Sequence, residues 1–244
     1  MSLLKDKVVL VTAAAGTGIG FATARRCQEE GAVVVLSDRH ERRLREAAGR
    51  LGGCLAAVCD VTEEDQVQAM VAKVVHEHGR LDVLVNNAGL GGTASLMQMT
   101  DAAWAKVLDV TLTGTMRCMR AALPVMVAQA GGVIVNNSSV LAWRAQAGQS
   151  HYAAAKAGVN ALTRCAAIEV AEHGVRINAV SPSLAMHAFL EKVTTAELLA
   201  ELAAKEAFGR PATPEEVANV IVFLASDLSS YMTGEVVSVS NQHA

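Results

Sequence analysis

The chain has 244 residues, 52% of them apolar and 18% charged, and its formal net charge is −3. This composition predicts a globular protein with a well-filled core and excludes an intrinsically disordered chain. There is no basic run, and no apolar stretch reaches the ~20 residues that span a bilayer, so we expect neither a nucleic-acid nor a membrane partner. The first residues show no signal-peptide pattern, and we expect a cytoplasmic protein.

Short apolar runs alternate with helical stretches along the whole chain. Seven runs rich in Val, Ile and Leu are predicted strands: residues 8–12, 33–37, 55–59, 81–85, 133–137, 175–180 and 236–240. The main predicted helices lie between them: residues 21–30, 42–51, 64–78, 101–128 and 150–172. Nearly continuous apolar strands are typical of parallel strands covered by helices on both faces. We predict an α/β fold with a doubly wound parallel sheet in a single domain, residues 1–244.

A glycine-rich loop, T-A-A-A-G-T-G-I-G at residues 12–20, joins the first predicted strand to a helix. Glycines let the backbone approach a pyrophosphate, and the free N–H groups of a helix start favour its negative charge. A tight turn without a ligand is the alternative, but the position between strand and helix favours nucleotide binding. The candidate cofactor residues of this loop are Ala13, Gly16, Thr17, Gly18 and Ile19.

Asp38 follows Gly18 by twenty residues and lies at the end of the second predicted strand. A carboxylate there can accept hydrogen bonds from both hydroxyls of a ribose, which favours NAD because the 2′-phosphate of NADP would meet a like charge. The neighbouring Arg39 keeps NADP open as the alternative, since a guanidinium can hold that phosphate. Capping of the next helix is the other interpretation of Asp38.

Polar residues also follow the third and fourth predicted strands, at the edge of the sheet where ligands bind in such folds. Asp60, followed by Val61, is placed either to bind an adenine amino group or to cap the next helix. The sequence N-N-A-G at residues 86–89 supplies the candidates Asn87, Ala88 and Gly89, with a simple turn as the alternative. Cysteines and histidines form no cluster with metal-ligand spacing, so we expect no metal site.

Tyr152 and Lys156 are four residues apart in H-Y-A-A-A-K-A-G, and Ser139 lies thirteen residues before the tyrosine. On a helix, residues four apart share a face, so the phenol and the ammonium are predicted neighbours. A phenol loses its proton near pH ~10, and an adjacent cation lowers that value. The pair is therefore a candidate acid/base, although a solvated helix face is the commoner reason for such spacing.

Together, these motifs resemble the classical short-chain dehydrogenase/reductases over nearly the whole chain. The matching pieces are residues 12–20, 60–61 and 86–89, Ser139, Tyr152-x-x-x-Lys156 and N-A-V-S-P at residues 178–182. The resemblance implies a seven-stranded Rossmann sheet with helices on both faces and a nicotinamide cofactor. It also implies a homotetramer or homodimer, built partly on the two longest helices.

The resemblance also implies a role for each of five residues. Tyr152 acts as acid/base at the substrate oxygen, Ser139 orients the same oxygen, and Ala185 touches the nicotinamide carboxamide. Lys156 holds the nicotinamide ribose and, together with the oxidised nicotinamide, lowers the Tyr152 pKa. Thr111 stands where the family commonly has an asparagine that helps to hold a water molecule linking the lysine to a proton relay.

The chain departs from the family pattern at three places. Ala13 replaces the usual first glycine of the loop, which is also one residue longer, so the phosphate contacts are open. Thr111 replaces the asparagine, and the C-terminal tail lacks the familiar Asp-Gly-Gly.

Residues 183–209 interrupt the alternation of strands and helices. A connection of this length is typical of a lid over an active site, with a surface helical hairpin as the alternative. Five apolar side chains are candidates for the wall of a substrate site, or for ordinary core: Leu184, Met186, Phe189, Leu190 and Trp143.

Residues 12–20, residues 181–190 and the terminal Gln242-His243 also resemble a group of actinobacterial reductases. That group is linked to the degradation of steroid rings as coenzyme A thioesters, and is similar to hydroxyindane-propanoyl-CoA dehydrogenases. The resemblance implies an NAD(P)-dependent oxidoreductase that interconverts a secondary alcohol and a ketone on an apolar, CoA-linked substrate, either steroid-ring-derived or fatty acyl.

Two other functions are weighed against this one. The first is a 3-oxoacyl-[acyl-carrier-protein] reductase of fatty-acid synthesis, which has the same chemistry. Asp38 argues against it, because biosynthetic reductases commonly use NADPH. The second is a non-catalytic dinucleotide-binding sensor, which would not need Ser139, Tyr152 and Lys156.

Overall fold

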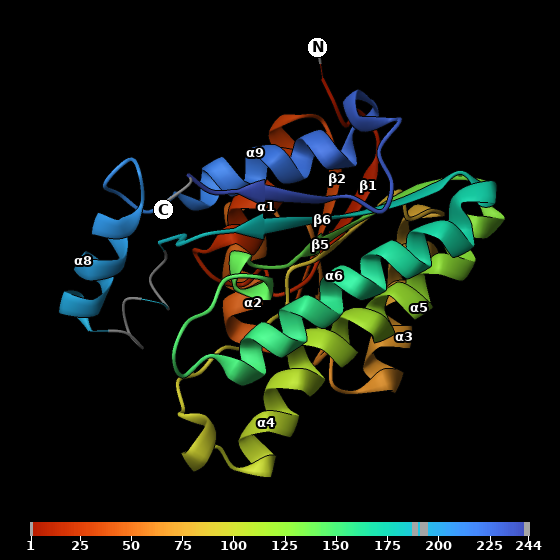
Figure 1. Ribbon diagram of the computed structural model, residues 1–244. Helices are drawn as coiled ribbons and strands as arrows, with labels where there is room; N and C mark the ends of the chain where they lie inside the picture. Colours follow the sequence, from red (N-terminus) through yellow and green to blue (C-terminus); the bar gives the residue numbers. More distant parts are fainter. Residues whose placement is uncertain (1, 187–189, 191–194, 242–244) are drawn as a thin grey trace.

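The computed structural model describes residues 2–186, 190 and 195–241, and its centre is one parallel sheet (Figure 1). The strands lie in the order β3-β2-β1-β4-β5-β6-β7, and every neighbouring pair is parallel. Their bounds are β1 Val8–Val11, β2 Val33–Asp38, β3 Leu55–Val58, β4 Val83–Asn86, β5 Gly132–Asn137, β6 Val175–Pro182 and β7 Val236–Val239. The predicted α/β fold with a seven-stranded, doubly wound parallel sheet is confirmed.

Helices cover both faces of the sheet. The longer ones are α1 Ile19–Glu29, α2 Glu41–Arg50, α3 Glu64–His78, α4 Asp101–Leu108, α5 Gly114–Ala128, α6 Ser150–Val170, α8 Ala196–Lys205 and α9 Pro214–Ala225. Short helical turns are η1 Leu96–Gln98, η3 Val140–Ala142, η4 Ala171–His173 and η5 Asp227–Ser229.

Alternate residues of a strand point into different cores, because successive side chains face opposite sides of a sheet. In β1, Val9 and Val11 pack with α1, α2 and α9, whereas Val8 and Leu10 pack with α3, α5 and α6. All four side chains are almost fully buried. This two-sided burial explains why the strands are continuous apolar runs rather than alternating ones.

The predicted helix over residues 101–128 is helical along its whole length. It contains a π-helical turn, η2 Asp109–Thr113, between α4 and α5, and the junction residues keep right-handed helical angles. The Thr111 side chain is turned to the backbone of Leu90, and the Thr115 hydroxyl donates a hydrogen bond of 2.9 Å to the Thr111 carbonyl. Side-chain hydrogen bonds thus replace part of the regular helical ladder, and such turns are frequent near functional sites.

The connection after β6 contains α8, which lies to one side of the sheet in Figure 1. Its base is closed by a backbone bridge between Ala185 and Ala212 and by a 3.2 Å hydrogen bond from Ser183 to Glu206. Phe189, Gln242 and His243 lie outside the described residues. No helix in the described ranges is both long and apolar enough to cross a membrane.

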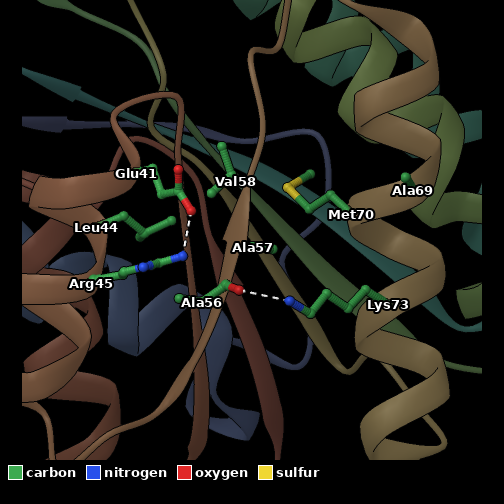
Figure 2. Close-up of a pocket in the computed structure, with 9 residues that line it drawn as sticks. All are labelled: Glu41, Leu44, Arg45, Ala56, Ala57, Val58, Ala69, Met70 and Lys73. Carbon is green, nitrogen blue, oxygen red and sulfur yellow. Dashed lines mark hydrogen bonds and ion pairs between the residues drawn. The ribbon is translucent and has the colours of Figure 1, made fainter.

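Figure 2 shows a cavity of about 340 Å³ at the β3 edge of the sheet, between α2 and α3. Lys73 donates to the carbonyl of Ala56 on β3, and Arg45 pairs with Glu41. Three strands, β2, β1 and β4, separate this edge from β5. We interpret Lys73 as a cation that protects an edge strand from pairing with another chain.

Candidate active site

Ser139, Tyr152 and Lys156 come together where β5 ends and α6 begins. Ser139 is the second residue after β5, and its backbone is extended. Tyr152 and Lys156 lie in the first two turns of α6. The Ser139 hydroxyl lies close enough to the Tyr152 phenol to lower its pKa. Since the N–H of Leu141 donates to the Ser139 oxygen at 3.2 Å, the serine hydroxyl proton is free to point toward the phenol.

The expected lowering of the Tyr152 pKa is wrong for the protein without a cofactor. Burial raises the pKa of Tyr152 to about 12, and the nearby Ser139 hydroxyl opposes this only in part. The Nζ of Lys156 lies over the tyrosine ring, 5.5 Å from its centroid. The phenol is therefore protonated at neutral pH, in the form that can donate a proton.

Lys156 is buried, with 3% of its surface exposed, and its Nζ donates a hydrogen bond to the carbonyl of Asn137. Burial lowers the pKa of Lys156 to about 8, because a low-dielectric environment disfavours the ammonium. Gly89 passes close by: a Cβ built there would lie 3.4 Å from Nζ. A larger residue at Gly89 would therefore crowd the ammonium.

The neighbouring Ser138 has a different place from Ser139. Its hydroxyl is buried and donates a 3.2 Å hydrogen bond to the backbone carbonyl of Lys156. Ser138 thus ties the end of β5 to α6, whereas Ser139 reaches the phenol. Of the two serines, Ser139 is therefore the one that acts on the phenol of Tyr152.

Thr111 lies near Lys156 but does not touch it through its hydroxyl. The hydroxyl accepts a hydrogen bond from the N–H of Leu90 at 2.9 Å and donates one to the carbonyl of the same residue at 3.1 Å. Thr111 is fully buried. Its side chain therefore fixes the loop after β4, next to Gly89, and this loop faces the ammonium of Lys156.

We predict that Thr111→Val lowers the free energy of unfolding by about 1–3 kcal/mol, because the partly buried N–H and carbonyl of Leu90 would lose their partner. Urea denaturation followed by circular dichroism measures this loss. Thr111→Ser retains the hydroxyl and is the conservative control, with stability close to that of the wild type. Equal stability of Thr111→Val and wild type would contradict the assigned role.

The glycine-rich loop is clamped to β4 through Asn87. The Asn87 amide donates to the carbonyls of Thr12 and Ala13 at 3.2 and 3.1 Å, and the Thr12 hydroxyl accepts from the N–H groups of Asn87 and Ala88. Ala13 has a positive φ of 51°. A Cβ at Gly20 would lie only 2.5 Å from the Asn87 amide, so this position requires glycine.

The glycine-rich loop also contacts the end of β2 through Ala14 and Ala15. The N–H of Ala14 donates to the carbonyl of Ser37, and that of Ala15 donates to the Asp38 carboxylate at 3.3 Å. By contrast, within the described chain no partner is found for the N–H groups of Gly16, Thr17 and Gly18, and no side chain caps α1. These free donors fit the pyrophosphate of a dinucleotide.

Two carboxylates lie at the ends of β2 and β3. Asp38 also accepts a 2.9 Å hydrogen bond from the N–H of His40. Asp60 accepts from the backbone and hydroxyl of Thr62, and it lies 3.8 Å from the Arg39 guanidinium. Burial raises the pKa of Asp60, but the hydrogen bonds from Thr62 outweigh it and hold the pKa below its usual value.

A cavity of about 430 Å³ opens beside Asp60. It is lined by Arg39, Asp60, Thr62, Ala105, Lys106, Asp109 and Val110. Val61 lies close by and packs against Gly114, where a Cβ would approach Val61 to 2.7 Å. The cavity is therefore next to the residues predicted to hold adenine, and the glycine allows α5 to pack tightly there.

Comparison with known proteins identifies the family. The family model described as enoyl-(acyl carrier protein) reductase matches residues 13–241. The chain belongs to the short-chain dehydrogenase/reductase family. Its members are oxidoreductases that act on alcohol and ketone groups and generally use NAD or NADP.

Three relatives are informative. A Mycobacterium tuberculosis protein named (5R,7aS)-5-hydroxy-7a-methyl-1-oxo-2,3,5,6,7,7a-hexahydro-1H-indene-carboxyl-CoA reductase is 64% identical, over 99% of this chain and 94% of that protein. The 3-oxoacyl-[acyl-carrier-protein] reductase FabG of Thermotoga maritima is 43% identical, over 97% of each chain. The crystal structure of a short chain dehydrogenase from Mycobacterium smegmatis has 60% identity and a TM-score of 0.88, over 100% of this chain and 95% of that one.

Sequence reasoning missed two residues of this short-chain dehydrogenase/reductase site. The sequence pattern indicates Thr12 only as the start of the glycine-rich loop. In the structure, its hydroxyl accepts hydrogen bonds from the backbone N–H groups of Asn87 and Ala88, which follow β4. Asn137 was counted only as the last residue of a strand, but its carbonyl holds Lys156. The adjacent pair N-N at the end of an apolar strand was the signal, since buried amides need partners.

Proposed function

We propose that this protein is an NAD-dependent dehydrogenase/reductase that interconverts a ketone and a secondary alcohol on an apolar, CoA-linked ring substrate. The observation that carries the chemistry is the gathering of Ser139, Tyr152 and buried Lys156 at one place. The glycine-rich loop adds free N–H donors for a pyrophosphate. We assign Ala185 to the nicotinamide end of the same cofactor, and Asp60 and Val61 to its adenine end.

In the direction of reduction, Tyr152 donates its proton to the substrate oxygen as that oxygen gains negative charge. Ser139 donates a hydrogen bond to the same oxygen and keeps it beside the phenol. Lys156 supplies a positive charge that stabilises the developing phenolate. A bound nicotinamide dinucleotide supplies or accepts the hydride.

Two observations support an apolar CoA-linked substrate. The first is the Mycobacterium tuberculosis relative, which is named as a CoA reductase of a fused-ring compound and shares 64% identity with this chain. The second is Trp143, which follows Ser139 by four residues and is 52% exposed. A large aromatic ring left open at this position provides apolar surface for a ring-bearing substrate.

A 3-oxoacyl-[acyl-carrier-protein] reductase is the second candidate, favoured by the 43% identity to the Thermotoga maritima enzyme. It needs the same Ser139, Tyr152 and Lys156. Asp38 argues for the first candidate, because its carboxylate disfavours the 2′-phosphate of NADPH. A non-catalytic sensor has no use for a serine, tyrosine and lysine gathered at one place.

The test is a panel of CoA-linked ring ketones and 3-oxoacyl thioesters, each assayed with NADH and with NADPH. We expect the highest kcat/KM for a ring ketone with NADH. A higher value for a 3-oxoacyl thioester on acyl carrier protein with NADPH would favour the second candidate. Binding of NADH without turnover of any carbonyl compound would favour the sensor.

We predict that Asp38→Ser shifts the preference from NADH toward NADPH by a factor of about ten or more in kcat/KM. The substitution removes the charge that repels the 2′-phosphate and leaves Arg39 available to hold it. The matched control is Asp227→Ser, a change at an exposed aspartate of η5. A wild-type enzyme that already prefers NADPH would overturn this role of Asp38.

The surface of α6 supports assembly with further copies of the chain. Ile168 is 80% exposed on this helix, an unusual position for a large aliphatic side chain. We propose a homotetramer or homodimer that covers it through the α5 and α6 surfaces. Sedimentation of a monomer alone at micromolar concentration would refute that assembly.

A further inference from the structure

Two adjacent asparagines end β5, and their side chains point to opposite faces of the sheet. Asn136 is fully buried on the face covered by α5 and α6, where its amide oxygen accepts from Asn86 and its amide nitrogen donates to Thr163, each at 2.9 Å. Asn136 is thus satisfied within the core. Asn137 points to the other face, toward the glycine-rich loop.

The orientation of the Asn137 amide follows from its partner. Asn87 must turn its amino group toward the carbonyls of Thr12 and Ala13, because a carbonyl can only accept. The Asn87 oxygen therefore faces Asn137, which must present its own amino group, and this hydrogen bond measures 2.9 Å. The oxygen of the Asn137 side chain is left on the other side.

That oxygen is buried and has no hydrogen-bond partner in the described part of the chain. A buried amide oxygen without a partner is costly, and native proteins rarely leave one unless a ligand or water occupies the place beside it. The backbone of the same residue already holds Lys156 through its carbonyl. Ser139 is two residues further along, in extended backbone with φ −163° and ψ 153°.

Asn137 therefore stands between the two halves of the site. Its side-chain amide donates a hydrogen bond to Asn87, which in turn holds the glycine-rich loop. Its backbone carbonyl accepts a hydrogen bond from Lys156. A dinucleotide with its pyrophosphate on that loop and its reactive end beside Tyr152 would pass this position. The groups near its reactive end that can donate a hydrogen bond are the carboxamide N–H and the ribose hydroxyls.

We propose that Asn137 is a cofactor-binding residue whose side-chain oxygen accepts a hydrogen bond from the nicotinamide half of the dinucleotide. This inference rests on the proposed use of a nicotinamide cofactor. The Asn137 side chain then has two roles. Its amide nitrogen holds Asn87 in place, and its amide oxygen binds a hydrogen-bond donor of the cofactor.

The experiment measures binding rather than turnover. Dissociation constants of NADH, ADP-ribose and ADP are determined by calorimetry for the wild type and for Asn137→Leu, which keeps the branched shape of asparagine without its amide. We expect NADH to bind about tenfold more weakly to the variant, while the affinity for ADP is unchanged. Loss with NADH alone identifies the carboxamide as donor, and loss with NADH and ADP-ribose identifies the ribose.

Two results would overturn the proposal. Equal weakening of NADH, ADP-ribose and ADP would mean that Asn137 acts only by supporting the loop, and unchanged NADH affinity would mean that its oxygen binds no cofactor donor. If the leucine variant does not fold, Asn137→Ala repeats the test with a side chain smaller than asparagine. Asn136→Thr is the matched control on the opposite face, with lower thermal stability and wild-type affinities. A wild-type protein that binds neither NADH nor NADPH would instead refute the proposed function.

Discussion

Replacing Tyr152 with phenylalanine is expected to reduce kcat on the order of 10³-fold while leaving the dissociation constant of NADH within about twofold of wild type. The phenol is the acidic group that reaches the substrate oxygen, and its pKa of about 12 keeps it protonated at neutral pH. Phenylalanine keeps the ring that lies under the Lys156 ammonium. The variant therefore loses a proton donor with little change in packing.

The chain provides a matched control for this substitution, because it has only two tyrosines. Tyr231 is fully exposed, far along the chain from Ser139 and Lys156. Tyr231→Phe should retain wild-type turnover and wild-type NADH affinity. Steady-state kinetics with the best ketone of the substrate panel, together with NADH titration, separates the two variants. Normal turnover by Tyr152→Phe would end the case for an acid/base phenol.

The fold was predictable because its strands have an unambiguous pattern. A strand buried on both faces must be apolar at every position, as Val8, Val9, Leu10 and Val11 are, and helices must separate parallel strands. The order of motifs then indicated the family, and family membership is confirmed. The active-site residues could be selected only because that resemblance linked positions that lie far apart in the sequence.

Other features depend on tertiary contacts that no local pattern encodes. The π-helical turn between α4 and α5 contains Thr111, which hydrogen-bonds to Leu90, twenty-one residues earlier. Spacing correctly made Tyr152 and Lys156 neighbours, but it could not say that the ammonium lies over the ring rather than beside the hydroxyl. Nor could spacing show that the phenol is buried, which raises its pKa.

Asn137 shows the same limit from another side. Its residue type signalled only that a polar group interrupts an apolar strand. The partners of its amide are determined by Asn87, fifty residues earlier, and by the carbonyls of the glycine-rich loop. A sequence can thus reveal that a buried amide needs partners, but only coordinates reveal which of its atoms lacks one.

Lys156→Met should lower kcat/KM for ketone reduction about 100-fold or more and should also remove a limb of the pH profile. Burial lowers the pKa of Lys156 to about 8, so the ammonium is charged below that pH and loses its charge as the pH rises through it. Tyr152, with a pKa of about 12, remains protonated across this range. In the wild type, the rate of reduction should therefore fall above about pH 8.

The lysine variant should instead show a low rate with no fall near pH 8, since methionine fills the space of the side chain without a titrating group. The measurement is kcat/KM for a ring ketone with NADH, from about pH 6 to about pH 9. Lys73→Met is the matched control, because Lys73 donates a hydrogen bond to a carbonyl of the edge strand β3. Three strands lie between β3 and β5 in the sheet. If the fall near pH 8 persisted in Lys156→Met, another group would have to carry that charge.

Burial displaces the pKa values of Lys156 and Tyr152 in opposite directions. The wild type therefore has a pH window in which the ammonium is charged and the phenol still holds its proton. Ketone reduction needs both conditions at once, and losing the ammonium removes one of them at every pH.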